Sequence, residues 1–471
     1  MQIVSQLIIQ WRDSMQAKTE NKMGTMPIPR LLLSLSLPMA LSMLVQALYN
    51  VVDSIYVSRV DEAALTSLSM AFPMQNLMIA VASGFAVGMN ALLSRSLGAR
   101  EFDKANRAAG NGLFLGIIGT LLFVLFGLFG ADAFINSQTT DEVIRAYGAG
   151  YLQIVCGISV FSFGQVILER LLQSTGRAVY SMITQATGAI INILLDPVFI
   201  FGYFGLPAMG VKGAAIATVI GQFVAMSLAF FFNVTRNPDI HLSAKQLAPK
   251  SDVIGEILRV GIPSTVMQSI GSVMTFAMNK ILIGFSSTAV AVFGVYFRMQ
   301  SFVVMPVIGI NGGLVPIIAY NYGARQPDRI MHALKLGILS AVVIMVGGLL
   351  LFQIAPQQLL SLFDASEAMT EMGTSALRII STHFPVAAFC IITGSMFQAL
   401  GDSVYSMYIS ILRQLAVLIP VAWLLSLSGN VNLVWLSFPI AEVMSLICSP
   451  FFLRRVYKKR VKPLYDAAPV Q

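Results

Sequence analysis

Charged side chains are scarce in this sequence. Asp, Glu, Lys and Arg account for 11% of the 471 residues, whereas 56% of the residues are apolar. A soluble domain normally has about a quarter charged residues. Cysteine is scarce as well, since the chain has 3, and each falls within an apolar run. An odd and scattered set of this kind argues against a disulfide framework and against a metal site.

Two functional signatures are also missing. No GxxxxGK[ST] phosphate loop occurs in the chain, so we expect no ATP to be bound within it. No connection between apolar runs exceeds about 20 residues, which leaves no room for a soluble catalytic or nucleotide-binding domain. We therefore expect no enzyme activity, no cofactor and no nucleic-acid partner. Energy for any transport would come from an ion gradient or from the solute itself.

Long apolar runs are what the sequence has instead. A hydrocarbon core of ~30 Å needs about 20 apolar residues per helix, and runs of this length recur along the whole chain. They predict an all-α integral membrane protein with twelve transmembrane helices. The predicted spans are 31–57, 63–94, 109–130, 146–169, 178–204, 211–233, 255–284, 287–320, 333–355, 373–399, 404–428 and 432–453.

Basic residues are distributed unequally between the two sides of the predicted membrane. If both termini and the even-numbered loops share one side, that side holds 23 of the 30 Lys and Arg, and the opposite side holds 4. Because short loops rich in Lys and Arg stay in the cytoplasm, both termini are predicted to be cytoplasmic. The net charge of +8 thus reflects topology rather than binding to nucleic acid.

The chain repeats itself at an offset of 225 residues. FPMQ at 72–75 aligns with FRMQ at 297–300, and GAREFD at 98–103 aligns with GARQPD at 323–328. Each half has an even number of spans, so both halves enter the membrane in the same orientation, as parallel repeats of secondary transporters do. The expected fold is therefore two parallel six-helix lobes. The expected domains are a cytoplasmic N-terminal segment (1–30), an N-lobe (31–235), a cytoplasmic linker (236–252), a C-lobe (253–455) and a basic cytoplasmic tail (456–471).

One carboxylate lies in the first apolar run, within the stretch ALYNVVDSIYV. Gln46, Asn50 and Asp53 are spaced by four and three residues, which places them on one face of a helix. Lipid offers such a stripe no partner, so the stripe is expected to point into protein or water. Asp53 also lies shortly before Arg59, where the run ends. The pattern therefore leaves two interpretations open, a functional carboxylate or a residue at the outer membrane interface.

A second polar site lies in the fifth apolar run, within NILLDPVF. Asn192 and Asp196 are four residues apart and share a helix face. Pro197 weakens the helical turn before Asp196, because proline removes one backbone hydrogen bond. Asp196 is deep in its span, which favours a functional role over a position at the membrane interface.

As a set, these motifs resemble the multidrug and toxic compound extrusion (MATE) family of bacterial transporters. The resemblance covers about residues 30–455 and rests on LPxxLSxLVQALYNVVDSIYV, on GAR-x-x-D after spans two and eight, on NILLDPVFIFG, on GAAIAT and on the repeat. It implies a V-shaped pair of lobes around a central cavity. It also implies secondary active multidrug efflux by alternating access, in which amphiphilic, often cationic compounds are exchanged for H⁺ or Na⁺. The implied location is the bacterial inner membrane, in contact with lipids and as a monomer.

The resemblance also assigns roles to individual residues. Asp53 occupies the position of the family's coupling aspartate, and Pro38 that of a proline at which the first helix can bend; Pro197 is expected to allow a second bend. The residues expected to couple to a proton or to Na⁺ are Asp53, Asn192, Asp196, Tyr151 and Thr218, with any Na⁺ held by Asp53, Asn192 and Asp196. The substrate cavity is expected to include Gln46, Tyr49, Asn50, Gln268 and Glu442.

The C-terminal half departs from one branch of the family. Sodium-type members of that branch carry acidic residues in spans seven and ten, where this chain has Gln268 and His383. Coupling is therefore expected at Asp53 and Asp196 alone.

A flippase of lipid-linked precursors, from the same wider superfamily, is the nearest alternative. Such proteins tend to have extra helices and a strongly cationic cavity, whereas the intramembrane bases here are Lys280, Arg298 and Arg413. Glu442 in span twelve either faces the cavity or pairs with one of these three bases. An integral-membrane transferase would need an acidic or His-rich catalytic loop, and the loops of this chain lack one.

Overall fold

The computed structural model describes residues 21–363 and 366–466. Parts of the predicted N-terminal segment and of the predicted basic tail therefore lie outside the described residues. The first half of the chain forms α2 (Lys22–Thr25), α3 (Ile28–Ser58), α4 (Glu62–Gly98), α5 (Phe102–Phe129), α6 (Ala131–Asn136), α7 (Glu142–Gly157), α8 (Val160–Ser174), α9 (Ala178–Phe201) and α10 (Val211–Arg236). The second half forms α11 (Ser251–Ile283), α12 (Ser287–Gly323), α13 (Pro327–Ile354), α14 (Pro356–Ser361), α15 (Glu367–Ser381), α16 (Phe384–Ala399), α17 (Val404–Ile411), α18 (Ile419–Ser426), α19 (Val431–Trp435), α20 (Ser437–Val456) and α21 (Lys462–Asp466).

The helices match the predicted number of membrane spans once two broken helices are taken into account. Within the described residues, 10 helices are long and apolar enough to cross a membrane, and two further pairs, α7 with α8 and α15 with α16, each bend by 48° at a short break. Counting each bent pair as one span gives 12. These pairs correspond to the predicted spans 146–169 and 373–399, for which the sequence analysis gave no break. Pro385 explains the second break, because a proline in the first turn of α16 cannot continue the hydrogen bonding of α15.

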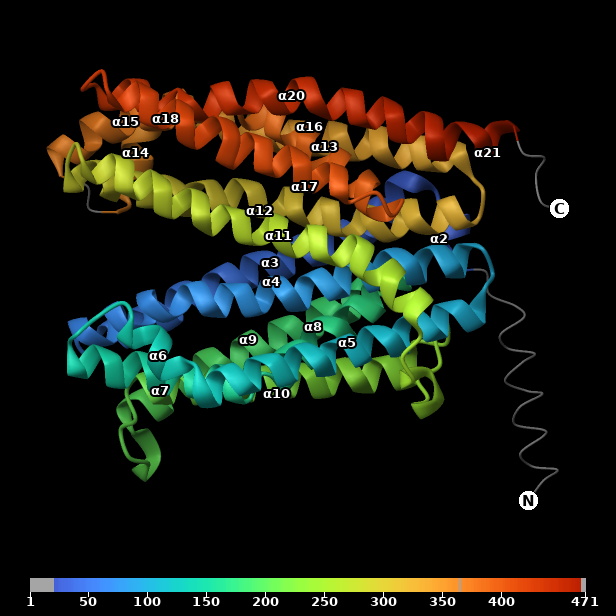
Figure 1. The fold of residues 1–471 in the computed structure, drawn as a ribbon, viewed down its shortest axis with the longest axis horizontal. Helices are drawn as coiled ribbons and strands as arrows, with labels where there is room; N and C mark the ends of the chain where they lie inside the picture. Colours follow the sequence, from blue (N-terminus) through green and yellow to red (C-terminus); the bar gives the residue numbers. More distant parts are fainter. Residues whose placement is uncertain (1–20, 364–365, 467–471) are drawn as a thin grey trace.

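The two halves of the chain have matching helices at the predicted offset. Shifting the bounds of α4, α5 and α6 by 225 residues gives those of α12, α13 and α14. The backbone is left-handed at Arg100 and again at Arg325, with φ of 61° and 54°. The turns that contain these two arginines lie at the same end of the molecule (Figure 1). The all-α fold with two parallel lobes is therefore confirmed.

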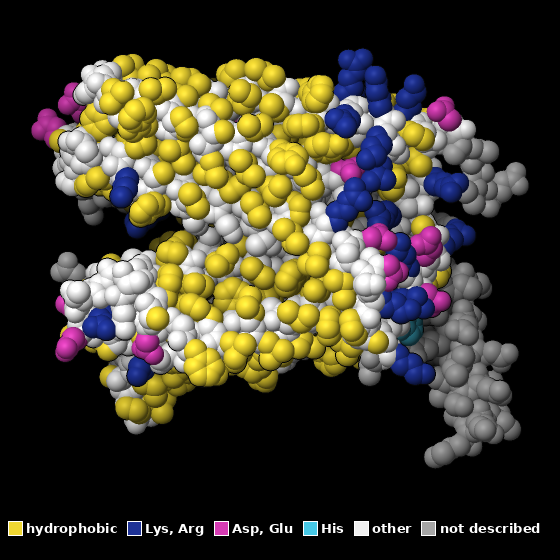
Figure 2. Space-filling model, in the orientation of Figure 1, with side chains coloured by type: hydrophobic (Ala, Val, Ile, Leu, Met, Phe, Trp, Pro, Cys, Tyr) yellow, Lys and Arg dark blue, Asp and Glu magenta, His cyan; other side chains and the backbone are white. Residues whose placement is uncertain are grey.

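The two ends of the molecule differ in charge and in closure. The first and last described helices, α2 and α21, lie at one end of the molecule, here called the terminal end (Figure 1). Figure 2 shows most of the visible Lys and Arg side chains gathered at this end. The lobes meet at the terminal end and are separated by a cleft at the opposite end, here called the far end (Figure 2). The molecule has the V shape that the sequence predicts, open at the far end.

The first helix of each half packs in two different hydrophobic cores. Leu31, Leu35 and Met39 in the first part of α3 belong to the large core cluster of the C-lobe, whereas Val57 near its end belongs to a core cluster of the N-lobe. Pro38 lies in the first of these parts, close to the change of partner. In the second half, the first part of α11 packs in an N-lobe cluster and its last part in the C-lobe cluster. The predicted N-lobe boundary at residue 31 therefore assigns the first part of α3 to the lobe that it does not pack in.

Close helix contacts depend on six glycines, of which Gly98 and Gly323 join α4 of the N-lobe to α12 of the C-lobe and are here called the inter-lobe glycines. A Cβ placed at Gly98 in α4 would lie 1.9 Å from the backbone oxygen of Tyr320 in α12, and one at Gly323 would lie 2.0 Å from the backbone oxygen of Arg95. Backbone atoms approach so closely only where a side chain is missing. The six form three pairs at the 225-residue offset: Gly84 and Gly309, Gly88 and Gly313, and Gly98 and Gly323.

Residues 21–26 connect the two lobes across the terminal end, and this segment is here called the strap. On the N-lobe side, the Asn21 side chain donates hydrogen bonds to the Thr175 backbone oxygen and to Asp239, both at 3.2 Å. On the C-lobe side, Arg329 donates to the backbone oxygens of Met23 (2.9 Å) and Met26 (2.8 Å). Burial raises the pKa of the Asp239 carboxyl, while a neighbouring arginine opposes this effect. The strap thus holds the terminal end in its closed arrangement.

Candidate coupling site

The centre of the candidate site is a hydrogen-bonded group on α9 and α10. The Asn192 amide nitrogen lies 3.3 Å from an Asp196 carboxylate oxygen and 3.3 Å from the Thr218 hydroxyl oxygen. Asp196 is fully buried, and the other two side chains are nearly so. The spacing of four residues puts Asn192 and Asp196 on one face of α9, and α9 packs against α10, which carries Thr218. Helical spacing predicted the common face of Asn192 and Asp196, and the family resemblance implied Thr218 as their partner.

Asp53 joins this group from α3. The α3 helix packs against α9, and Asp53 is half-buried with its carboxylate close enough to that of Asp196 for the two charges to interact. Of the two interpretations that the sequence left open, this placement agrees with a carboxylate inside the N-lobe. Three buried oxygens of the site accept no hydrogen bond from the described residues: one each of Asp53, Asp196 and Asn192. Such oxygens are suited to hold a proton or a hard cation.

Tyrosines and glutamines surround the two carboxylates. The hydroxyl of Tyr151 on α7 donates to Gln75 on α4 at 3.3 Å, and it lies within electrostatic reach of Asp53. The Tyr49 hydroxyl is hydrogen-bonded to the side chain of Gln46. Neighbouring polar groups therefore fix the orientation of both tyrosines. Gln75 was missed as a site residue by the sequence analysis, because its partner Tyr151 lies on another helix and spacing along one helix cannot reveal such a pair.

Three other residues were predicted to line the substrate cavity. Glu442 is buried and forms an ion pair with Arg413, with 3.3 Å between the guanidinium nitrogen and the carboxylate oxygen. Arg413 is thus the partner among the three bases that the sequence left open. Gln268 is exposed on α11. Asn50 follows Tyr49 on α3 and is exposed.

The site offers carboxylate, amide and hydroxyl oxygens, and it contains neither histidine nor cysteine. No group of three or more His, Cys, Asp or Glu side chains that could hold a metal ion occurs in the described part of the chain. The donor set that Asp53, Asn192, Asp196 and Thr218 provide is one that alkali cations prefer, since hard cations take oxygen ligands.

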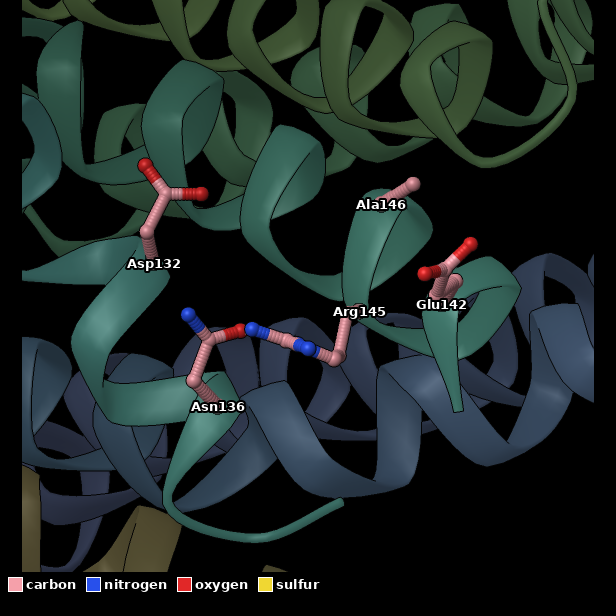
Figure 3. Close-up of a pocket in the computed structure, with 5 residues that line it drawn as sticks. All are labelled: Asp132, Asn136, Glu142, Arg145 and Ala146. Carbon is pink, nitrogen blue, oxygen red and sulfur yellow. The ribbon is translucent and has the colours of Figure 1, made fainter. Parts of the chain in front are cut away.

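A separate pocket lies at the surface between α6 and α7. It has a volume of about 290 Å³ and is lined by Asp132, Asn136, Glu142, Arg145 and Ala146. Figure 3 shows the Arg145 side chain directed toward Asn136, to which it donates a hydrogen bond. None of the predicted site residues lines this pocket, so it adds nothing to the coupling site.

Comparison with known proteins identifies the family. A family model described as MatE matches residues 38–198 and 263–424, once in each half of the repeat. The chain belongs to the MATE family. A curated relative, the multidrug export protein MepA of Staphylococcus saprophyticus, is 27% identical over 436 residues, which cover 92% of this chain and 94% of the relative.

Solved structures of MATE proteins share the fold. One described as the straight conformation is 25% identical with a TM-score of 0.88 and covers 95% of this chain and 100% of its own. Another, described as the bent conformation, is 25% identical with a TM-score of 0.86, and the match covers 93% of this chain and 97% of the solved one. The resemblance stated from the motifs is therefore confirmed at the level of family and fold.

Proposed function

We propose that this MATE protein is a secondary active transporter, and not an enzyme, that exports amphiphilic, often cationic compounds in exchange for H⁺ or Na⁺. The single observation that carries the proposal is the pair of carboxylates, Asp53 and Asp196, in one poorly solvated group with Asn192 and Thr218. Two neighbouring carboxylates in such a place cannot both stay charged at low cost. The pair therefore takes up a proton or a cation and gives it back when its surroundings change.

The packing of α3 suggests how the ion acts on the lobes. The helix carries Asp53 in the N-lobe, while its first part, with Pro38, packs in the core of the C-lobe. A proline removes one helical hydrogen bond, so a bend there costs little. Ion binding can shift the protein between two conformations only if the ion binds one conformation more tightly than the other. We propose that a proton or Na⁺ at Asp53 and Asp196 favours one shape of α3, and that substrate favours the other; Pro197 beside Asp196 gives α9 a similar freedom.

The charges of the C-lobe favour drug export over lipid-precursor flipping. Of the three intramembrane bases, Arg413 is paired with the buried Glu442. The other two, Lys280 and Arg298, are too few to form the strongly cationic cavity that a carrier of anionic lipid-linked precursors needs.

Transport in proteoliposomes tests the proposed function. The purified protein, reconstituted at known orientation, should move the cationic dye ethidium or a second cationic dye against its concentration gradient when ΔpH or ΔNa⁺ is imposed. Collapse of the active gradient by an ionophore should stop this movement. If the rate of dye movement does not change when either gradient is imposed, antiport is refuted.

The proposed orientation places the terminal end in the cytoplasm. A cysteine at Ser243, in the connection between α10 and α11, should resist a membrane-impermeant maleimide in intact cells and react after the cells are opened. A cysteine at Thr140, on the connection at the far end, should react in intact cells and serves as the matched control; both sites are exposed. Cys156 and Cys390 are buried and Cys448 is half-buried, so labelling of the unsubstituted protein gives the background. Labelling of Ser243→Cys in intact cells would reverse the orientation.

A further inference from the structure

A second buried carboxylate of the N-lobe, Glu169 on α8, has no role in the site described above. It is 6% exposed. One of its oxygens accepts hydrogen bonds from two neutral donors, the Gln165 amide at 3.1 Å and the Thr184 hydroxyl at 3.0 Å. The predicted span 146–169 ended at this residue, so the sequence analysis treated Glu169 as part of a membrane boundary. The structure places it inside the bundle instead.

No opposite charge compensates Glu169 directly. None of the ion pairs found among the described residues includes it. Arg170 is the charged group whose field acts on Glu169, but the two are adjacent in sequence, and adjacent residues of a helix point about 100° apart. The group that faces Glu169 from α9 is the neutral Thr184. A carboxylate in this setting is costly to keep charged.

Polar side chains lie between the neighbourhood of Asp53 and that of Glu169. Gln46, about two helical turns before Asp53 on α3, accepts a hydrogen bond from Gln185 on α9 at 2.6 Å. Gln185 follows Thr184 in the sequence and points from a different face of α9, and the Thr184 hydroxyl binds Glu169. Along α9 the distance from Asp196 to Thr184 is about 18 Å, at ~1.5 Å per residue. The polar side chains thus run from the coupling pair toward the terminal end through the interior of an apolar lobe.

The end of α8 that carries Glu169 and Arg170 lies against the C-lobe. A guanidinium nitrogen of Arg170 is 3.9 Å from the position that a Cβ of Gly312 on α12 would take. The loop that follows α8 contacts the strap, since the Thr175 backbone oxygen accepts from Asn21 at 3.2 Å. Separation of the lobes at the terminal end would remove these neighbours. Glu169 would then meet water from that side.

We propose that Glu169 is a further proton-carrying carboxylate, which exchanges protons between the Asp53–Asp196 pair and the solution at the terminal end when the lobes part there. This inference rests on the proposed function. One proton is bound and one is released at Glu169 in each cycle, so the step consumes no other reactant.

Proton-linked efflux of ethidium from proteoliposomes tests this proposal. Glu169→Gln keeps an acceptor for the Thr184 hydroxyl and removes the proton site. We expect it to slow ΔpH-driven efflux about tenfold, in the range typical of coupling between sites, and to flatten the dependence of the rate on pH at the terminal end. Glu169→Asp should restore part of the pH dependence. Glu142→Gln, the same change at an exposed position of α7, should match the wild type.

Each other result has a definite meaning. An unchanged rate and pH profile in Glu169→Gln, with efflux lost in Asp53→Asn, would refute the role of Glu169 and leave the proposed function standing. A uniform loss at every pH, without rescue by Glu169→Asp, would make Glu169 a structural residue and also refute the proposal. Full activity in both Glu169→Gln and Asp53→Asn would refute the proposed function itself. Size-exclusion chromatography and equilibrium binding of ethidium establish that each variant is folded.

Discussion

Replacement of Asp196 by Asn should abolish gradient-driven efflux while the protein still folds and binds its substrate. The change removes the ionisable group but keeps an oxygen in the position that accepts from Asn192. The rate should fall to that of protein-free vesicles, because an exchanger without its ion site has nothing to couple to the gradient. Asp53→Asn should give the same result, since the two carboxylates share the ion.

The matched control for this prediction is Asp132→Asn. Asp132 is exposed on α6 and accepts a hydrogen bond from Gln153 at 2.9 Å, so the same substitution is made far from the pair. Its efflux should equal that of the wild type. Wild-type transport by Asp196→Asn would show that the buried pair is structural.

Replacement of Gly98 by Ala should shift the lobes toward the state in which the terminal end is open. Gly98 is within α4, where its backbone is helical, and Ala alone would stabilise a helix by up to about 1 kcal/mol. The added Cβ, however, would lie 1.9 Å from the backbone oxygen of Tyr320, which cannot rotate away. Overpacking of this kind costs ~1–3 kcal/mol. That cost falls on the closed arrangement only, so the open state gains population.

Spin labels at Phe102 and Asp328, at the starts of α5 and α13, measure this shift. The distance distribution between them should move to longer values in Gly98→Ala, and dye efflux should decrease because the cycle stalls in one state. Gly271→Ala on α11 is the control, since no atom lies within 4 Å of the Cβ position there. If Gly98→Ala leaves the distances unchanged, the inter-lobe glycines do not determine the closure of the terminal end.

The sequence predicted most of the fold because membrane helices are encoded locally. Apolar runs of sufficient length indicate spans directly, and the repeat gave the lobes, the parallel orientation and the register that the helix bounds now show. The breaks at α7–α8 and α15–α16 were missed. The first break does not interrupt the apolar pattern, so hydropathy contains no signal for it. The second falls at the polar residues Ser381, Thr382 and His383, which together with Pro385 could have indicated it.

The candidate site was predictable where helical spacing determines neighbours and not elsewhere. Asn192 and Asp196 share a face at a spacing of four, and Asp53 was placed with them by family resemblance. Contacts between helices, such as Gln46 with Gln185, depend on how the bundle packs. Glu169 was missed for a related reason. Its neighbour Arg170 makes the end of the span look like a membrane boundary, and only the tertiary structure shows that the bundle continues past it.

The strap has a consequence for biosynthesis. It precedes the first membrane helix, yet Arg329, which holds its backbone, is synthesised about 300 residues later. The first part of α3 likewise waits for its partners in the C-lobe core. Because domains form in the order in which they leave the ribosome, the first helix to enter the membrane is among the last to complete its packing. Until the second half has been synthesised, the apolar surface of the first part of α3 is exposed and accessible to quality-control proteases.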